Sequence, residues 1–286
     1  MLALKHIAKY LSILIFSGLL ISCEIETNKS VSIEEAIKTV NENAEATAIF
    51  KDVFNEVNDA AVYADDSLSG KYQKSQFNAD DEPEITITPF DYNSWPKTIT
   101  IDYGNENMGC ADMRERRGII EILASDFYRN PGCELEISFN EFYQNDHKIE
   151  GYKQVTYQGE NEEGNPVYLI QVDQGVITTP EDFTYSFEQN LEQTWVEGQL
   201  SESPWDDVYL ITGNQEGISS DSVNYTLLID GENPLNVRVG CRWIREGIIT
   251  IKIDDFQDIK LDYGEGVCDN AATVTIYGDE YLINME

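Results

Sequence analysis

Thr98-Ile-Thr-Ile-Asp-Tyr-Gly104 is the stretch that decides the fold of this chain, because apolar and polar residues alternate along it. A period of two places the apolar side chains on one face of an extended segment, as in a half-buried β-strand. The alternation recurs to the end of the chain, and turn residues interrupt it at short intervals. We therefore expect a mainly β fold over residues 98–286, an antiparallel β meander that forms either a sandwich or an open or curled sheet.

One segment of this region fits two kinds of structure. Phe183, Phe187, Leu191 and Trp195 are four residues apart, which suits a helix face and also one side of a strand. Aromatic residues and threonine near both ends of the segment favour a strand. The clearer alternating segments are 98–103, 135–139, 223–229, 237–243, 249–253 and 259–263.

The residues before this β region divide into a helical segment and a linker. In residues 31–63 apolar side chains recur near helical spacing, and Ser32 ahead of Glu35 suits a helix start. Residues 64–97 are rich in Asp, Ser, Asn and Pro, which break regular structure. We expect a short N-terminal helical segment over 31–63 and a linker over 64–97, with one extended piece at 85–88.

The opening stretch has a partner near the end of the chain, Asp258-Ile-Lys-Leu-Asp-Tyr-Gly264. Each copy leads through a short loop to a cysteine. Asp102 and Asp262 suit hydrogen bonds to turn amides, while Gly104 and Gly264 suit a positive φ. Because neither copy has the alternating ligands of a calcium loop, a role in turns is favoured over a calcium or substrate site.

The first 23 residues have the pattern of an export signal. Lys5 and Lys9 precede an apolar run over residues 10–21 that leads to Cys23. This run of about 12 residues is shorter than the ~20 that a helix needs to cross a bilayer. We expect residues 1–22 to be a lipoprotein signal peptide that is removed, the alternative being an ordinary secretory signal followed by a chance cysteine.

Leu20-Ile-Ser-Cys23 is similar to a lipobox, which implies that Cys23 becomes the acylated first residue of the mature chain. Two or three acyl chains exceed the single chain that binds membranes only marginally, so attachment is expected to be stable. Residues 23–30 would then be a tether. An aspartate directly after the acylated cysteine resembles a signal for retention in the inner membrane. This chain has Glu24 at that position, which favours an outer-membrane lipoprotein. Both the periplasmic and the cell-surface face of that membrane remain open.

The chain is strongly acidic, with 53 Asp and Glu against 19 Lys and Arg. Loss of Lys5 and Lys9 with the signal peptide shifts the net charge from −34 to about −36. Such a charge repels phosphate backbones and anionic head groups, which argues against nucleic-acid binding and polybasic membrane contact. The membrane is therefore expected to be a partner only through the lipid anchor.

Four cysteines remain after Cys23, and an exported location permits disulfides. Cys110 with Cys133 and Cys241 with Cys268 would close the shortest loops, and this pairing is the favoured one of three. The alternative is free buried thiols. The spacing does not suit zinc, since no CxxC occurs and only His147 could add an imidazole to the mature chain.

Known catalytic motifs do not occur in this chain, and no cofactor site is predicted. His147 follows Asn145-Asp146 and is expected in an exposed turn. The arginines of 114–117, and Arg238 with Arg242, are expected to neutralise nearby carboxylates, the alternative being an anionic ligand. Trp205 is the tryptophan best suited to a loop, where its indole could stack on a sugar or a partner. The other three tryptophans are expected in the core; these are Trp95, Trp195 and Trp243.

Several of these motifs together resemble those of uncharacterised lipoproteins from Gram-negative bacteria. The resemblance rests on the lipobox, the two Asp-Tyr-Gly units, Cys241-Arg-Trp-Ile244 and the region Phe50-Lys-Asp-Val-Phe-Asn-Glu-Val57. It spans nearly the whole mature chain and implies an envelope location and an all-β domain, without any assigned activity. Cys133 departs from the usual turn of that family.

The sequence therefore favours a non-enzymatic lipoprotein of the cell envelope that binds a protein or a glycan or has a structural part. The alternative is a carbohydrate-active enzyme that uses a paired Asp/Glu site, which would require an open cleft with two facing carboxylates beside a tryptophan. A third class, an outer-membrane assembly factor, would require an exposed apolar groove or an unpaired strand edge.

Acylation of Cys23 can be measured by growing cells with a clickable fatty acid. We expect the wild-type chain to incorporate the label and Cys23→Ala to lose it, because the sulfur and the freed amino group of this residue are the acceptors. Equal labelling of both chains, or none of the wild type, would contradict the predicted anchor.

Overall fold

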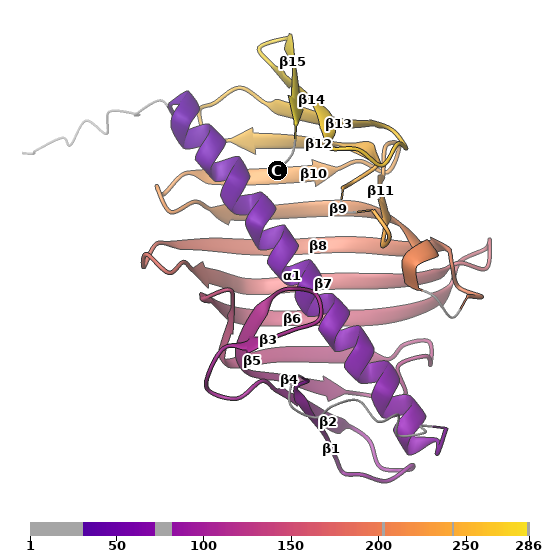
Figure 1. Ribbon diagram of the computed structural model, residues 1–286. Helices are drawn as coiled ribbons and strands as arrows, with labels where there is room; N and C mark the ends of the chain where they lie inside the picture. The colour runs from indigo at the N-terminus through magenta and orange to yellow at the C-terminus, as the bar shows by residue number, and fades with distance from the viewer. Residues whose placement is uncertain (1–30, 72–81, 202–203, 242, 285–286) are drawn as a thin grey trace, which may run out of the picture. The chain divides into compact units, whose positions relative to one another are not determined.

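One antiparallel sheet of 15 strands forms most of the computed structural model, and a single α-helix, α1, crosses one face of it diagonally (Figure 1). The structure describes residues 31–71, 82–201, 204–241 and 243–284. They belong to one compact unit, Val31–Glu286. The predicted signal peptide, Cys23 and the tether lie outside the described residues.

The strands follow one another in the sheet almost in chain order, from β1 at one edge to β15 at the other. Two short strands leave this order: β3 pairs with β4, and β11 pairs with both β9 and β12. The predicted antiparallel meander is confirmed as a single open sheet. Its strands are β1 (Glu84–Thr88), β2 (Lys97–Asp102), β3 (Met108–Gly109), β4 (Glu115–Ala124), β5 (Glu134–Gln144), β6 (His147–Glu160), β7 (Pro166–Thr178), β8 (Thr184–Glu197), β9 (Val208–Ile218), β10 (Asn224–Ile229), β11 (Leu235–Arg238), β12 (Glu246–Ile253), β13 (Ile259–Glu265), β14 (Ala271–Ile276) and β15 (Asp279–Asn284).

Helix α1 (Ile33–Leu68) begins at the predicted cap. The Ser32 side chain accepts a hydrogen bond from the Glu35 amide, and the Glu35 carboxylate accepts one from the Ser32 amide at 2.9 Å. This reciprocal pair satisfies two amides that a helix start leaves open. The helix continues beyond the predicted limit of residue 63, because Ala60, Ala61 and Ala64 extend the buried stripe. The linker expected over 64–97 therefore begins as helix, while β1 matches the extended piece predicted at 85–88.

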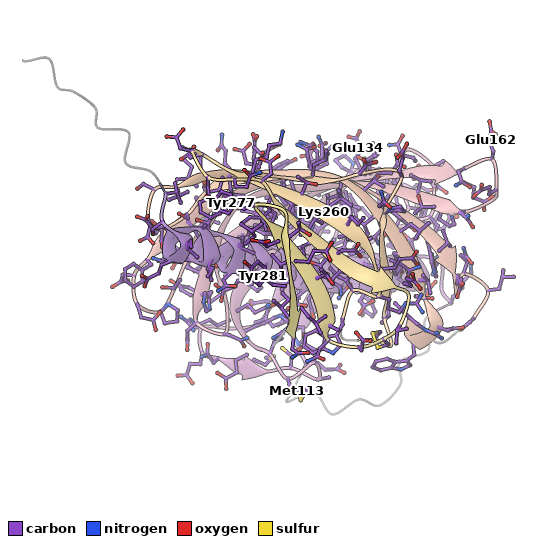
Figure 2. The ribbon with its side chains drawn as sticks, turned by 90° about the horizontal axis from the view of Figure 1, so that it is seen from above. Met113, Glu134, Glu162, Lys260, Tyr277 and Tyr281 are labelled. Atoms are coloured by element: carbon purple, nitrogen blue, oxygen red, sulfur yellow. A yellow bond between two sulfur atoms is a disulfide. The ribbon has the colours of Figure 1, made fainter. Side chains whose placement is uncertain are left out.

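The inner face of the sheet, defined as the face that α1 covers, carries the core. Phe50 of α1 is fully buried, and its ring stacks on Phe187 of β8 with centroids 5.3 Å apart. Phe139 of β5 approaches the same ring edge-on at 6.3 Å. The opposite face is polar, and Figure 2 shows Glu134 there, pointing away from α1. The predicted alternation thus separates one helix-covered face from one solvated face.

Cys241 and Cys268 form a disulfide, with 5.9 Å between their Cα atoms. It links the segment after β11 to the segment after β13, and a loop of this length contributes about 3.5 kcal/mol in the chain-entropy account. Cys110 and Cys133 are free cysteines, so the pairing favoured between them is wrong. Cys110 lies before the start of β4 and Cys133 after its end, and ten residues of strand span about 30 Å.

The two Asp-Tyr-Gly units share the same local hydrogen bond, the first at the end of β2 and the second within β13. The Gly104 amide donates to the Asp102 carboxylate at 2.8 Å, and the Gly264 amide donates to Asp262 at 2.9 Å. Both glycines have positive φ, 79° and 87°, which a side chain would disfavour. The expected hydrogen bonds of the two aspartates and the positive φ of both glycines are confirmed, but the expected turn is wrong for the second unit, which lies within β13 beside a register shift.

The packing of α1 on the sheet predicts a large effect of Phe50→Ala. We expect this change to lower the free energy of unfolding by about 3–5 kcal/mol, because it removes the ring at the centre of the aromatic cluster. Phe90→Ala is the matched control, since Phe90 is 69% exposed and its loss should cost no more than about 0.5 kcal/mol. Urea denaturation measures both, and equal costs for the two variants would contradict the packing.

Candidate functional site

Two hollows lie beside α1 on the inner face, and both are lined by helix and strand residues. The first, which we call the aromatic cleft, encloses about 610 Å³ and lies over β6–β9. The second, which we call the apolar cavity, encloses about 270 Å³ and extends over β6–β13. Phe54 of α1 lines both, so the two hollows are neighbours along the helix.

Four half-buried aromatic rings from four consecutive strands give the aromatic cleft its character. Tyr157 of β6 is directly opposite Tyr168 of β7, and their rings stack at 5.1 Å. Trp195 of β8 is directly opposite Tyr209 of β9, and these rings stack at 5.8 Å. Cross-strand pairing therefore sets the rings in two stacked pairs along one end of the inner face.

Polar groups from the connecting loops complete the cleft. Asn165, from the turn between β6 and β7, accepts a hydrogen bond at 3.2 Å from the Gln199 side chain, which also donates to the Trp195 carbonyl oxygen at 2.5 Å. In the cleft wall, the Tyr128 hydroxyl is buried and makes no hydrogen bond to another described residue. These groups add amide and hydroxyl functions next to the exposed faces of the rings.

Two carboxylates, Asp207 and Glu160, also line the aromatic cleft. Burial raises the pKa of Asp207, and the nearby Asp206 charge raises it further. The Tyr209 hydroxyl donates to Asp207 at 3.4 Å. Gly198 lies so close that an added Cβ would come within 2.1 Å of the Asp207 carboxylate. A carboxyl with a raised pKa in a cleft that also contains a second carboxylate is one feature that the enzyme alternative requires.

The apolar cavity contains an uncommon group, the fully buried amine of Lys153 on β6. Its Nζ donates a hydrogen bond to the Phe50 carbonyl oxygen at 2.7 Å and lies 5.8 Å and 5.7 Å from the ring centroids of Phe50 and Phe54. No carboxylate of the described chain pairs with it. Burial lowers the pKa of Lys153 to about 7 because the charged form loses its hydration.

The arginine-rich segment 114–117 binds carboxylates of the chain itself. Arg116 is fully buried and pairs with Asp112 at 2.6 Å and with Glu56 of α1 at 3.3 Å. The Glu56 carboxylate also accepts a hydrogen bond from Tyr103 at 2.6 Å. Arg114 pairs with Asp52 and Arg117 with Asp146. For Arg114, Arg116 and Arg117 the interpretation that they neutralise nearby acids is confirmed, and the cluster ties α1 to β4 and to Tyr103, which follows β2.

The other residues considered from the sequence lie apart from both hollows. His147 follows the expected turn, but its side chain is 18% exposed and its Nε2 lies 3.1 Å from a Glu45 carboxylate oxygen of α1, so the expected exposure is wrong. Trp205 lies in the 3-10 turn Pro204–Asp206 and is 69% exposed, as expected. Arg242 lies outside the described residues. Trp195, expected in the core, instead lines the aromatic cleft.

Comparison of the chain with protein-family models, curated proteins and solved structures finds no match. Within the described residues, no three or more His, Cys, Asp or Glu side chains are grouped so that they could hold a metal ion. No described helix combines the length and the apolar character needed to cross a bilayer.

The lowered pKa of Lys153 predicts a pH-dependent stability. Between pH 7 and about 9.5 the unfolded chain, with an ordinary lysine pKa near 10.4, holds a proton that the folded chain has released. Stability relative to Lys153→Met should therefore rise with pH, by up to about 3 kcal/mol across this range. Denaturant titrations of both proteins at several pH values measure the difference in their free energies of unfolding. A difference that stays constant with pH would contradict the lowered pKa of Lys153.

Proposed function

We propose that this chain is a lipid-anchored outer-membrane protein with a non-enzymatic role, and that its aromatic cleft binds a glycan. The observation that carries the glycan proposal is the row of four half-buried rings, Tyr157, Tyr168, Trp195 and Tyr209, flanked by amide and hydroxyl groups. Aromatic faces pack against the apolar faces of sugar rings, while the polar groups select hydroxyl positions. The anchor rests on the lipobox-like sequence at Cys23.

The charge of the chain narrows the class of glycan. Asp207 and Glu160 line the cleft, and among the residues that the structure describes Arg129 is the one basic side chain that lines it. With a net charge of −34, the protein repels anionic polysaccharides, which favours an uncharged oligosaccharide. A volume of about 610 Å³ falls within the range of known ligand pockets and suits a short segment of such a chain.

The second candidate function is hydrolysis of the bound glycan. It is favoured by one observation, the raised pKa of Asp207 in a cleft that also contains Glu160. In that case Asp207 would donate a proton to the leaving oxygen while Glu160 acted as the second carboxylate. The two functions differ in a single readout, the release of shorter sugars from an oligosaccharide incubated with the protein.

Binding can be tested with neutral oligosaccharides of four to six glucose, mannose or N-acetylglucosamine units. We expect wild-type protein to bind at least one of them, and Trp195→Ala to weaken this binding at least tenfold, about 1.4 kcal/mol, because the change removes a stacking face. Tyr157→Ala should act in the same direction. Calorimetry gives the affinities, and thermal melting checks that the variants fold.

Tyr281→Ala is the matched control, since Tyr281, labelled in Figure 2, is 53% exposed on the edge strand β15 and does not line the cleft. It should bind like the wild type. Binding that survives Trp195→Ala and Tyr157→Ala, or no binding to any member of the panel, would contradict the glycan proposal. Release of shorter sugars that disappears in Asp207→Asn would replace the non-enzymatic proposal with the hydrolytic one.

A further inference from the structure

The apolar cavity is separate from the aromatic cleft, and its two ends differ in chemistry. Aliphatic side chains of β10, β12 and β13 line the end far from β6; these are Leu227, Ile229, Ile249, Ile251 and Leu261. The amine of Lys153 and the amide of Gln189 lie at the β6–β8 end. A long apolar surface that ends at a buried amine matches an aliphatic chain that ends in an acid group.

The cavity opens to solvent along one stripe of α1. Ala44, Ala48 and Lys51 line the cavity and are also exposed. They are spaced four and three residues apart, so they follow one another along the same side of the helix. The two small alanines leave room above the sheet, and the Lys51 amine lies at the rim. The cavity therefore reaches the solvent beside α1.

The buried amine is incompletely paired within the described chain. A protonated lysine has three N–H donors, and the Phe50 carbonyl accepts one of them. The rings of Phe50 and Phe54 offer only cation–π contact to the rest. Taking a charge out of water is costly unless it is paired and hydrogen-bonded. An anion beside Lys153 would supply both kinds of partner.

The charge of the lining is opposite to that of the whole chain. The protein has 53 acidic residues, yet none of those in the described part of the chain lines the apolar cavity. The titratable side chains there are Lys51 from α1, Lys153 from β6 and Tyr263 from β13. Within an acidic protein, this is a place where an anion meets two amines and no carboxylate.

We propose that the apolar cavity binds an aliphatic carboxylic acid, whose carboxylate pairs with Lys153 and whose chain lies along the aliphatic side chains of β10, β12 and β13. The volume of about 270 Å³ lies near the lower limit for ligand pockets, which favours chains of medium length over very long ones. The ligand is held without a covalent bond. Lys51, whose side chain lines the cavity and also reaches the solvent, adds a second amine, and partial burial lowers its pKa as well.

Calorimetry with dodecanoate and dodecanol separates the contribution of the ligand's negative charge from that of its alkyl chain. We use residues 31–286, because Val31–Glu286 is a compact unit that contains both hollows and the buried core. Dodecanoate should bind at least tenfold tighter than dodecanol to the wild type. Lys153→Met should abolish this preference while it retains dodecanol, because methionine keeps a similar apolar stem and cannot be charged.

Proton uptake provides an independent readout. At pH 8 the free Lys153 amine is largely neutral, so pairing with a carboxylate should take up close to one proton per dodecanoate, measured by comparing two buffers of different ionisation enthalpy. Uptake should persist in Lys51→Met, which removes the other lysine of the cavity, and disappear in Lys153→Met. Acids of 8 to 16 carbons then locate the preferred length.

Lys252→Met is the matched control, since Lys252 is exposed on β12 and outside the cavity; it should bind both ligands as the wild type does. Thermal melting checks that each variant folds. Equal affinity of the wild type for dodecanoate and dodecanol, unchanged dodecanoate binding by Lys153→Met, or no binding of either ligand would overturn the proposal. Oligosaccharide binding is measured separately, so failure here leaves the glycan proposal standing.

Discussion

The structure depends on the burial of one sheet face by one helix. Strands of 13 or 14 residues such as β7 and β8 are about 45 Å long, whereas a helix with its side chains is only about 10–12 Å wide. Helix α1 can therefore cover a diagonal band of the inner face and no more. Along the band, Phe50 and its aromatic neighbours make a dry core. Beside the band, the sheet must present polar side chains, aromatic edges or hollows, and this constraint explains why both candidate sites lie next to the helix.

Much of this arrangement follows from local patterns. Alternation of apolar and polar residues identifies β2, β5, β8, β10, β12 and β13, and the Ser32 cap marks the start of α1. The strand expected over 237–243 is wrong beyond its first two residues, because β11 ends at Arg238 and a turn follows. The end of α1 is harder to locate, since Ala64 and Leu68 continue the helix through a stretch whose composition suggests a linker. The cysteines show a different limit. Short separation along the chain favoured Cys110 with Cys133, but a strand placed between two residues carries them to opposite ends of the sheet.

The candidate sites could be predicted only in part, because they assemble from residues distant in the chain. Tyr157, Tyr168, Trp195 and Tyr209 become neighbours through the register of four strands, which no local pattern specifies. One signal was present in the sequence: Lys153 occupies an inward position of an alternating strand, two residues before Val155. A charged residue at such a position is unfavourable unless it is paired, and therefore marks a place that requires a partner.

Amide hydrogen exchange measured residue by residue tests the central claim most directly. If α1 is the cover on which the sheet depends, the inward-facing part of the helix around Phe50 and the central strands β6–β8 should exchange only through global opening, with the same free energy. Both should lose protection together when denaturant is added. Exchange of the α1 amides at a much lower free energy than those of β6–β8 would show that the sheet stands without the helix, and would contradict this account.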